Sequence, residues 1–127
     1  MSKRIVMTEE APQAIGPYSQ AVVGGGFVFA AGQLALDPHT GQLVPGDVRI
    51  QTKRVMENIK AILESAGSSL ANVVKTTVFL RDLNDFGAMN EIYGSYFQED
   101  PPARSTVQVA KLPRDGAVEI EVVALLK

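Results

Sequence analysis

The stretch Asp47–Arg81, DVRIQTKRVMENIKAILESAGSSLANVVKTTVFLR, decides the fold class because the spacing of its apolar residues changes midway. From residue 48 to residue 66 the apolar residues recur at helical spacing, which predicts a helix with Asp47 as N-cap and Gly67 as C-cap. Residues 73–81 are rich in β-branched side chains and alternate in polarity, which predicts a strand. A helix followed by a strand indicates a mixed α and β domain.

The segments on either side complete one sheet and add a second helix. Residues 18–34, YSQAVVGGGFVFAAGQL, predict an antiparallel hairpin that turns on three glycines. Residues 83–97, LNDFGAMNEIYGSYF, predict a shorter helix capped near Asn84. Residues 103–110 and 117–127 predict two closing strands joined by a turn. The predicted element order is therefore ββαβαββ.

This order predicts a two-layer α/β (α+β) sandwich with one mixed sheet, formed by a single domain of residues 1–127. Because crossovers between parallel strands are almost always right-handed, both helices should cover the same face of the sheet. The last strand has two distinct faces, an apolar one of Val118, Ile120, Val122, Ala124 and Leu126, and a mixed one of Glu119, Glu121, Val123 and Leu125. The mixed, helix-free face predicts a contact with other copies of the chain.

The composition is that of a folded globular domain, with 46% hydrophobic and 20% charged residues among 127. No apolar run approaches the roughly 20 residues of a membrane-spanning helix, so no membrane partner is expected. Residues 1–13 lack the apolar core of a signal peptide, so a cytoplasmic location is expected. The net charge of −2 and the scattered Lys and Arg residues predict no nucleic-acid partner.

The chain has no cysteine and one histidine, which narrows the possible chemistry. Disulfides, thiolate nucleophiles and Cys-based zinc sites are excluded. His39 lies in a turn rich in Pro and Gly and is expected to be exposed, so neither a His-dependent triad nor a multi-His metal site is expected. No acidic cluster has the spacing of a ligand set, so no metal site is predicted.

Arg104 is the main candidate for a binding residue, because it begins a half-apolar strand directly after DPPA. Antiparallel pairing of the last two strands would place Arg104 and Glu119 close together on one face. One interpretation is a structural ion pair. The other is that Arg104 clamps a substrate carboxylate while Glu119 handles protons or water beside it. Burial would raise the pKa of Glu119 and a nearby arginine would lower it, so the sequence does not fix its direction.

Three further residues are weaker candidates. Tyr18 follows a Gly-Pro pair in AIGPYSQA and is either a packed aromatic or a site residue. Gly32 interrupts an apolar strand, where glycine marks a bulge or the close approach of a ligand. Asn90 shares a helical face with Tyr93, and core packing and capping account for such pairs more often than catalysis does.

Taken together, the motifs AIGPYSQA, FAAGQL, VVKTTVFLRDLNDF, PPARSTVQVAKLP and EIEVVAL resemble the RidA (YjgF) family of reactive intermediate deaminases over nearly the full length. The resemblance implies a chorismate-mutase-like fold and a homotrimer with sites in the clefts between subunits. The helix-free face would then be the trimer contact.

The same resemblance implies an activity. Family members hydrolyse enamine and imine acids such as 2-aminoacrylate, which pyridoxal-phosphate enzymes release, to 2-keto acids and ammonia without a cofactor. By resemblance Arg104 binds the substrate carboxylate and Glu119 positions or activates water. Tyr18 and Asn90 match further pocket residues, and Gly32 matches a position whose backbone faces the ligand.

Thr106 matches another position whose backbone faces the ligand, and here the chain departs from some relatives. Those relatives carry a cysteine where this chain has Thr106 and a serine where it has Ala31. The departures should leave the arginine clamp intact and change the substrate range.

Two other functions remain open on the sequence. The same cleft can bind a small carboxylic acid such as a keto acid without turning it over, as a sensor or a chaperone-like module. A ribonuclease or translation inhibitor is a third possibility, against which the absence of a basic stripe and of a second histidine argue.

Overall fold

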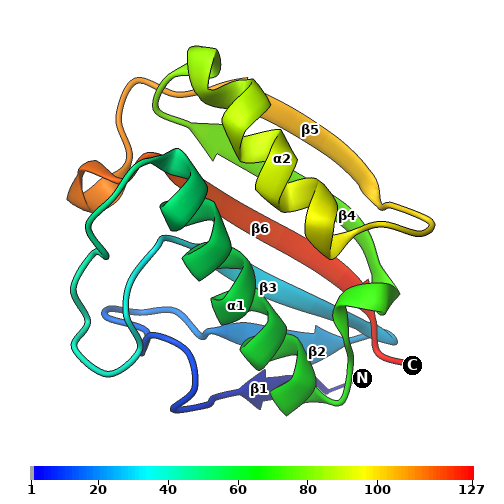
Figure 1. Ribbon diagram of the computed structural model, residues 1–127. Helices are drawn as coiled ribbons and strands as arrows, with labels where there is room; N and C mark the ends of the chain where they lie inside the picture. The colour runs from blue at the N-terminus through cyan, green and yellow to red at the C-terminus, as the bar shows by residue number, and fades with distance from the viewer. Residues whose placement is uncertain (1) are drawn as a thin grey trace.

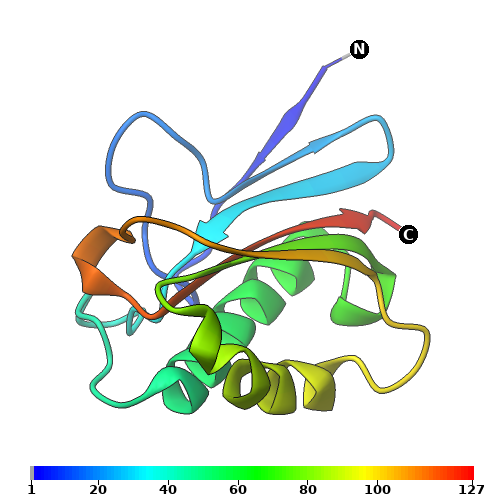
Figure 2. The same ribbon diagram turned by 90° about the horizontal axis from the view of Figure 1, so that it is seen from above.

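A computed structural model describes residues 2–127, and it folds into one six-stranded sheet with two helices on the same face (Figures 1 and 2). The strands are β1 (Arg4–Val6), β2 (Ala21–Gly24), β3 (Phe27–Gln33), β4 (Val73–Leu80), β5 (Ala103–Gln108) and β6 (Val118–Leu125). The helices are α1 (Val48–Ala66) and α2 (Phe86–Tyr96), with short 3-10 turns η1 (Leu70–Asn72), η2 (Leu83–Asp85) and η3 (Pro113–Asp115). The predicted two-layer α/β sandwich is confirmed.

The prediction missed strand β1, which adds one strand before the predicted ββαβαββ order. β1 pairs antiparallel with β2, with Val6 opposite Ala21, and forms one edge of the sheet. With three residues, of which Ile5 and Val6 are apolar, it carries too short an alternation to indicate a strand.

The order of strands across the sheet is β1-β2-β3-β6-β4-β5, and only the β4–β5 pair is parallel (Figure 1). The predicted pairing of the last two strands is therefore wrong, because β4 lies between β5 and β6. Helix α2 provides the crossover that a parallel β4–β5 pair requires, which leaves β5 at the edge of the sheet. The chain from β5 to β6 then passes over the end of β4.

The core lies between α1 and the sheet face beneath it. The side chains of Val55, Ile59 and Leu63 are fully buried there. The predicted apolar face of β6 is confirmed for Val118, Ile120, Val122 and Ala124, which are all buried, whereas Leu126 follows the strand and is half-buried. The opposite face, which we call the open face, has no helix over it in Figure 2 and exposes Phe27, Phe29, Val107 and Leu125.

No helix within residues 2–127 has the length and apolar character needed to cross a bilayer.

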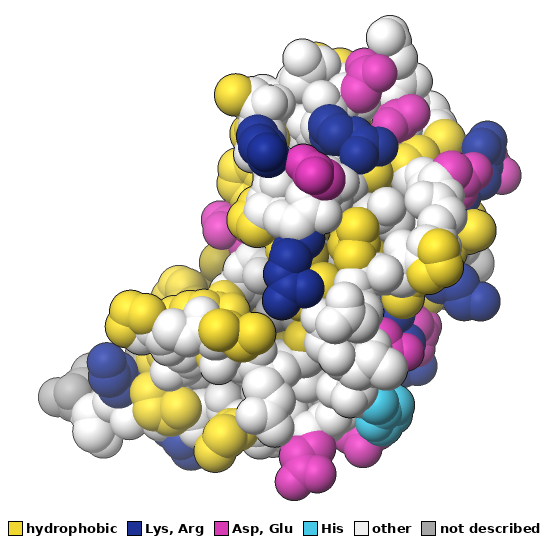
Figure 3. Space-filling model, turned by 90° about the vertical axis from the view of Figure 1, so that its left-hand side faces the viewer, with side chains coloured by type: hydrophobic (Ala, Val, Ile, Leu, Met, Phe, Trp, Pro, Cys, Tyr) yellow, Lys and Arg dark blue, Asp and Glu magenta, His cyan; other side chains and the backbone are white. Residues whose placement is uncertain are grey.

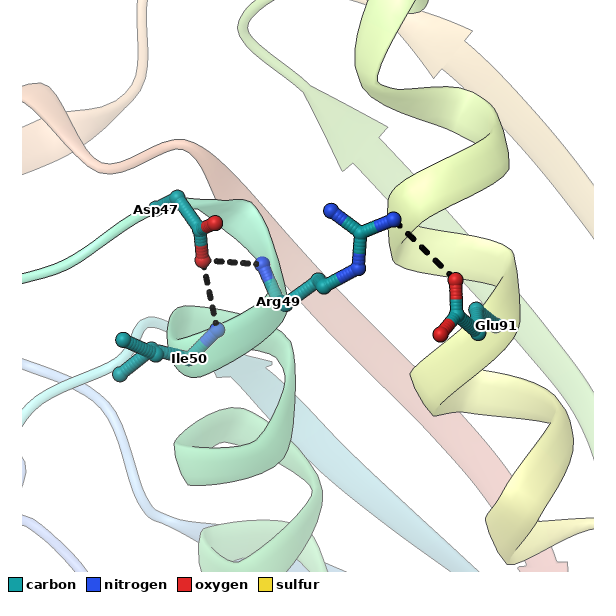
Figure 4. Close-up of polar contacts among 4 residues, drawn as sticks. All are labelled: Asp47, Arg49, Ile50 and Glu91. Atoms are coloured by element: carbon teal, nitrogen blue, oxygen red, sulfur yellow. Dashed lines mark hydrogen bonds and ion pairs between the residues drawn. The ribbon is translucent and has the colours of Figure 1, made fainter.

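Helix α1 begins and ends as predicted. The Asp47 carboxylate accepts hydrogen bonds from the backbone N–H groups of Arg49 and Ile50 at 3.0 and 3.2 Å (Figure 4). Gly67 ends the helix with φ +91°, a left-handed conformation that favours glycine. The Arg49 guanidinium lies 3.1 Å from the Glu91 carboxylate and so joins α1 to α2.

The predicted cap near Asn84 needs correction. The Asp82 carboxylate accepts from the N–H of Asn84 at 2.9 Å and so begins η2, a tight turn that leads into α2 at Phe86. Asp85, the residue just before α2, makes no side-chain cap hydrogen bond.

Replacing Asp47 with alanine should lower the free energy of unfolding by about 1 kcal/mol, because two N–H groups of the first turn lose their acceptor. Asp85→Ala is the matched control: it also removes an acidic residue before a helix, but no cap bond is lost with it. Urea denaturation at one fixed protein concentration measures both. Equal effects of the two variants would contradict the capping role of Asp47.

Candidate functional site

Arg104 lies on the helix side of edge strand β5, in a cradle made by α2. Its guanidinium carbon is 4.8 Å from the ring centroid of Tyr93 and 5.3 Å from that of Phe86. Its Nη1 donates a hydrogen bond of 2.6 Å to Oδ1 of Asn90. Phe86, Asn90 and Tyr93 follow one another at spacings of four and three residues, so they form a single stripe on α2. The cradle orients the arginine through π faces and an amide, none of which carries a negative charge.

The ring of Tyr93 is itself fixed from below. Its hydroxyl shares a hydrogen bond of 2.7 Å with Oγ1 of Thr76, which is fully buried on β4. Thr76 is the residue opposite Arg104 in the β4–β5 register. Burial raises the pKa of Tyr93, so its hydroxyl stays neutral beneath the guanidinium. The β4–β5 register and the stripe of residues on α2 therefore both position Arg104.

The structural ion pair between Arg104 and Glu119 does not form within the chain. Glu119 on β6 lies opposite Phe79 on β4, and its side chain points to the open face. The Arg104 side chain points to the helix side. Two strand spacings and three residues along the strand put their Cα atoms about 14 Å apart. Among residues 2–127, no carboxylate lies within 4.0 Å of Arg104, because the ion pairs are Arg49–Glu91 and Lys111–Asp115.

A shallow pocket of about 360 Å³ lies next to this cradle. Arg104, Asn90 and Tyr93 line it together with Pro101 and Pro102. Thr106 follows two residues later on β5, so its side chain projects from the same side of the strand as that of Arg104. Its Oγ1 is buried and has no hydrogen-bond partner within residues 2–127. Arg104, Asn90 and Thr106 thus form one group, which we call the arginine half-site.

Three other predicted residues come together on a different part of the molecule. Tyr18, Gly32 and Glu119 line one pocket of about 380 Å³, which we call the glutamate half-site. Glu119 is half-buried, and that burial, followed by the charge of Glu121, raises its pKa above the usual range. The sequence did not fix the direction of the pKa shift of Glu119. In the structure the shift is upward, because no arginine opposes the effect of burial.

Gly32 leaves the space that the Glu119 carboxyl group occupies. The β3–β6 register slips between Ala30 and Gln33, so Gly32 lies in a β-bulge, one of the two roles predicted for it. A Cβ atom at position 32 would overlap Oε2 of Glu119 and lie 2.9 Å from its Cδ. A side chain at this position therefore requires the carboxyl group to move.

The loop that carries Tyr18 is fixed by a residue that the sequence did not indicate, Gln20. Its buried side-chain amide donates to the carbonyl oxygens of Thr8 and Pro12 at 3.0 and 2.7 Å and accepts from the N–H of Thr8 at 2.7 Å. Tyr18 itself is 54% exposed, and its hydroxyl accepts weakly from the N–H of Ile15 at 3.3 Å. Tyr18 is therefore free on one side to meet a ligand or another subunit.

His39 is exposed in a turn, as predicted, where the Asp37 carboxylate accepts from the N–H groups of His39 and Thr40. These two bonds, the largest causes, lower the pKa of Asp37. Within residues 2–127, no three His, Cys, Asp or Glu side chains are grouped so that they could hold a metal ion.

Known proteins resemble the chain over nearly its whole length. The family profile described as Endoribonuclease L-PSP matches residues 8–126. A RutC family protein of Pyrococcus abyssi is 58% identical over 124 residues, 98% of each chain. The 2-iminobutanoate/2-iminopropanoate deaminase of Mus musculus is 52% identical over 123 residues, 97% of this chain and 91% of the mouse protein.

Solved structures agree with these matches. The crystal structure of E. coli TdcF with bound serine superposes with a TM-score of 0.92 at 47% identity, covering 96% of this chain and 98% of that one. A conserved Rid family protein of Yersinia pestis, described as of unknown function, gives a TM-score of 0.96 at 46% identity, covering 98% and 99%. The chain therefore belongs to the Endoribonuclease L-PSP family, which is the RidA (YjgF) family.

Proposed function

We propose that this protein hydrolyses reactive 2-imino and enamine acids, such as 2-aminoacrylate, to 2-keto acids and ammonia. The observation that carries the proposal is the Arg104 cradle, which presents a guanidinium with one of its five N–H donors used by Asn90 and no carboxylate within 4.0 Å among residues 2–127. A planar fork of this kind binds a carboxylate through two hydrogen bonds. The name of the mouse relative, an imine deaminase, supports the same reaction.

The active site in this proposal is shared between subunits of a homotrimer. Arg104 and Glu119 are too far apart to act on one small molecule within a chain, and they face opposite sides of the sheet. Contact that extends from the open face, with its exposed Phe29 and Val107, around the β5 edge would let the arginine half-site of one subunit meet the glutamate half-site of the next. The raised pKa of Glu119 belongs to the separate chain, and an arriving guanidinium would lower it.

The proposed mechanism is hydrolysis without a covalent intermediate. The enamine tautomerises to an imine, water adds to the imine carbon, and ammonia leaves as the keto acid forms. Arg104 binds the carboxylate, and backbone donors near Gly32 and Thr106 orient it. Glu119 directs the water, while Tyr18 and Asn90 complete the pocket. Such imines already hydrolyse readily in water, so a modest rate acceleration is sufficient. Positioning of the substrate together with one acid–base group supplies an acceleration on the order of 100-fold.

A second candidate function is binding of a small carboxylic acid without turnover. The observation in its favour is that E. coli TdcF, 47% identical, was crystallised with bound serine. A ribonuclease function has the name of the family in its favour. The net charge of −2 and the single exposed histidine do not support it.

The decisive experiment generates 2-aminoacrylate in situ with a serine dehydratase and follows keto-acid release with and without the protein. Light scattering on the same sample measures the oligomeric state. Acceleration above the buffer rate by a trimer is the expected result. A folded trimer that binds 2-oxobutanoate but leaves the rate unchanged would overturn the deaminase proposal in favour of the binding module.

Replacing Gly32 with alanine should lower the deaminase activity by roughly 10- to 100-fold, because the new methyl group displaces the Glu119 carboxyl group by about 1 Å. The free energy of unfolding should change by less than about 1 kcal/mol, since the flexible end of a side chain gives way. Gly24→Ala, also in a strand but with open space around its Cβ position, is the control. Equal activity of both variants would show that the position of Glu119 is unimportant.

A further inference from the structure

The glutamate half-site continues outward as a groove along the loop that carries Tyr18. A second pocket of about 270 Å³ adjoins the first, and the two share Pro12, Gln13, Ile15 and Leu36. Glu119 and Arg114 both line the first pocket, and Arg114 also contacts Gly41 in the turn of residues 37–41, which lines the second pocket; we call this junction the outer end of the groove. The lining combines the apolar Ile15, Leu34 and Leu36 with three glutamines, Gln13, Gln20 and Gln33. The two pockets together have room for a substrate longer than 2-aminoacrylate.

Arg114 is held at the outer end by an unusual turn. Arg114 and Asp115 both have positive φ, +61° and +55°, although neither is glycine. The Arg81 guanidinium donates to the carbonyl oxygen of Asp115 at 3.0 Å, and Nη1 of Arg114 donates to the carbonyl oxygen of Gly41 at 3.1 Å. Backbone strain of this kind persists where the surroundings enforce it, and it is concentrated at functional sites.

The charge of Arg114 is not neutralised within the described chain. One hydrogen bond, to Gly41, occupies one of its five donors, and no carboxylate among residues 2–127 lies within 4.0 Å of it.

Figure 3 views the molecule from the side on which η3 and the loop before α1 project in Figure 1. On this side a basic side chain stands near the middle, with apolar side chains on some sides of it and other side chains between them. A ligand in the first pocket meets the positive charge of Arg114, which lines that pocket.

We infer that Arg114 is a specificity residue that binds the distal carboxylate of 2-imino dicarboxylic acids. The inference rests on the proposed function. The substrate's first carboxylate binds the neighbouring subunit's arginine half-site, its imine carbon lies at Glu119, and its methylene groups pass Ile15 and Leu34 to reach Arg114. The reaction is R–C(=NH)–COO⁻ plus H₂O giving R–C(=O)–COO⁻ plus NH₃, where R ends in a second carboxylate.

The test compares two imines of five carbons that differ in the distal carboxylate. An L-amino acid oxidase with catalase converts glutamate to 2-iminoglutarate and norvaline to 2-iminopentanoate, and competition with semicarbazide trapping measures their hydrolysis. The variants are Arg114→Asn, which tolerates positive φ, and Arg114→Lys, which keeps the charge. Lys111→Asn is the control, because Lys111 is an exposed cation near the same turn whose one ion pair within residues 2–127 is a 3.6 Å contact with Asp115.

Arg114→Asn should lower the ratio of kcat/KM for 2-iminoglutarate to that for 2-iminopentanoate about tenfold, the effect of one charge-assisted hydrogen bond at a partly exposed site. Arg114→Lys and Lys111→Asn should keep most of the ratio. An unchanged ratio in Arg114→Asn, with 2-iminopentanoate still hydrolysed faster than in buffer, would overturn the inference and leave the proposed function intact.

Calorimetric binding of the products separates the remaining outcomes. The protein should bind 2-oxoglutarate more tightly than 2-oxopentanoate, and Arg114→Asn should abolish the difference. If no imine is hydrolysed but this preference holds, the deaminase proposal fails and the Arg114 subsite stands as a binding site. If neither hydrolysis nor an Arg114-dependent preference is seen, both the deaminase proposal and the Arg114 subsite are wrong.

Discussion

The Arg104→Ala variant is expected to lose the acceleration of 2-aminoacrylate hydrolysis, with kcat/KM falling at least about 100-fold to the rate in buffer. The physical reason is the loss of two charge-assisted hydrogen bonds to the substrate carboxylate, which nothing else in the arginine half-site replaces. Asn90 and Tyr93 remain in place but carry no positive charge. The measurement is initial keto-acid release over a range of imine concentrations.

Two further variants make the result specific. Arg104→Lys keeps the charge but not the planar fork, so it should recover only part of the activity. Arg49→Ala removes an exposed arginine whose pairing with Glu91 links the helices, and it should keep full activity (Figure 4). Full activity of a folded Arg104→Ala trimer would refute the role of this arginine.

The sequence was sufficient where the pattern is local. Helix α1 was predictable because its apolar spacing, Asp47 cap and Gly67 cap all lie within 21 consecutive residues. The two faces of β6 were predictable for the same reason, since alternation along one strand assigns Val118 and Glu119 to opposite sides. Strand β1 was not predicted, because three residues are too few to show an alternating pattern.

The relative positions of Arg104 and Glu119 were not predictable from pairing rules alone. Strands that follow each other usually pair, but here a parallel strand was inserted between them, and parallel pairing leaves no local mark in the sequence. Part of the cradle around Arg104 was predictable, because the spacing of Asn90 and Tyr93 places them on one face of a helix. What the sequence lacked was the register that places Thr76 beneath Tyr93 and opposite Arg104.

The Glu119→Gln variant is expected to lower kcat by roughly 100-fold or more, because the amide fills the same space but no longer exchanges a proton with water. If the carboxylate is the active form, the wild-type rate falls as the pH drops through the pKa that Glu119 has in the assembled site. That acid limb should be missing in Glu119→Gln. Glu121→Gln, which removes the second cause of the raised pKa, should keep activity and move the limb to lower pH.

The same substitution should stabilise the fold near neutral pH. In the separate folded chain the pKa of Glu119 is higher than its ordinary value of 4.5, so this chain binds the proton more tightly and loses stability as the pH rises through the raised pKa. Glutamine has no such penalty. At a protein concentration low enough to keep the subunits apart, the urea midpoint of Glu119→Gln should therefore exceed that of the wild type at pH 7, and the excess should shrink as the pH falls through the raised pKa and be gone below about pH 4.5. A variant that is both less active and less stable at pH 7 would contradict this, because it would make Glu119 a structural residue rather than one kept for chemistry at the expense of stability.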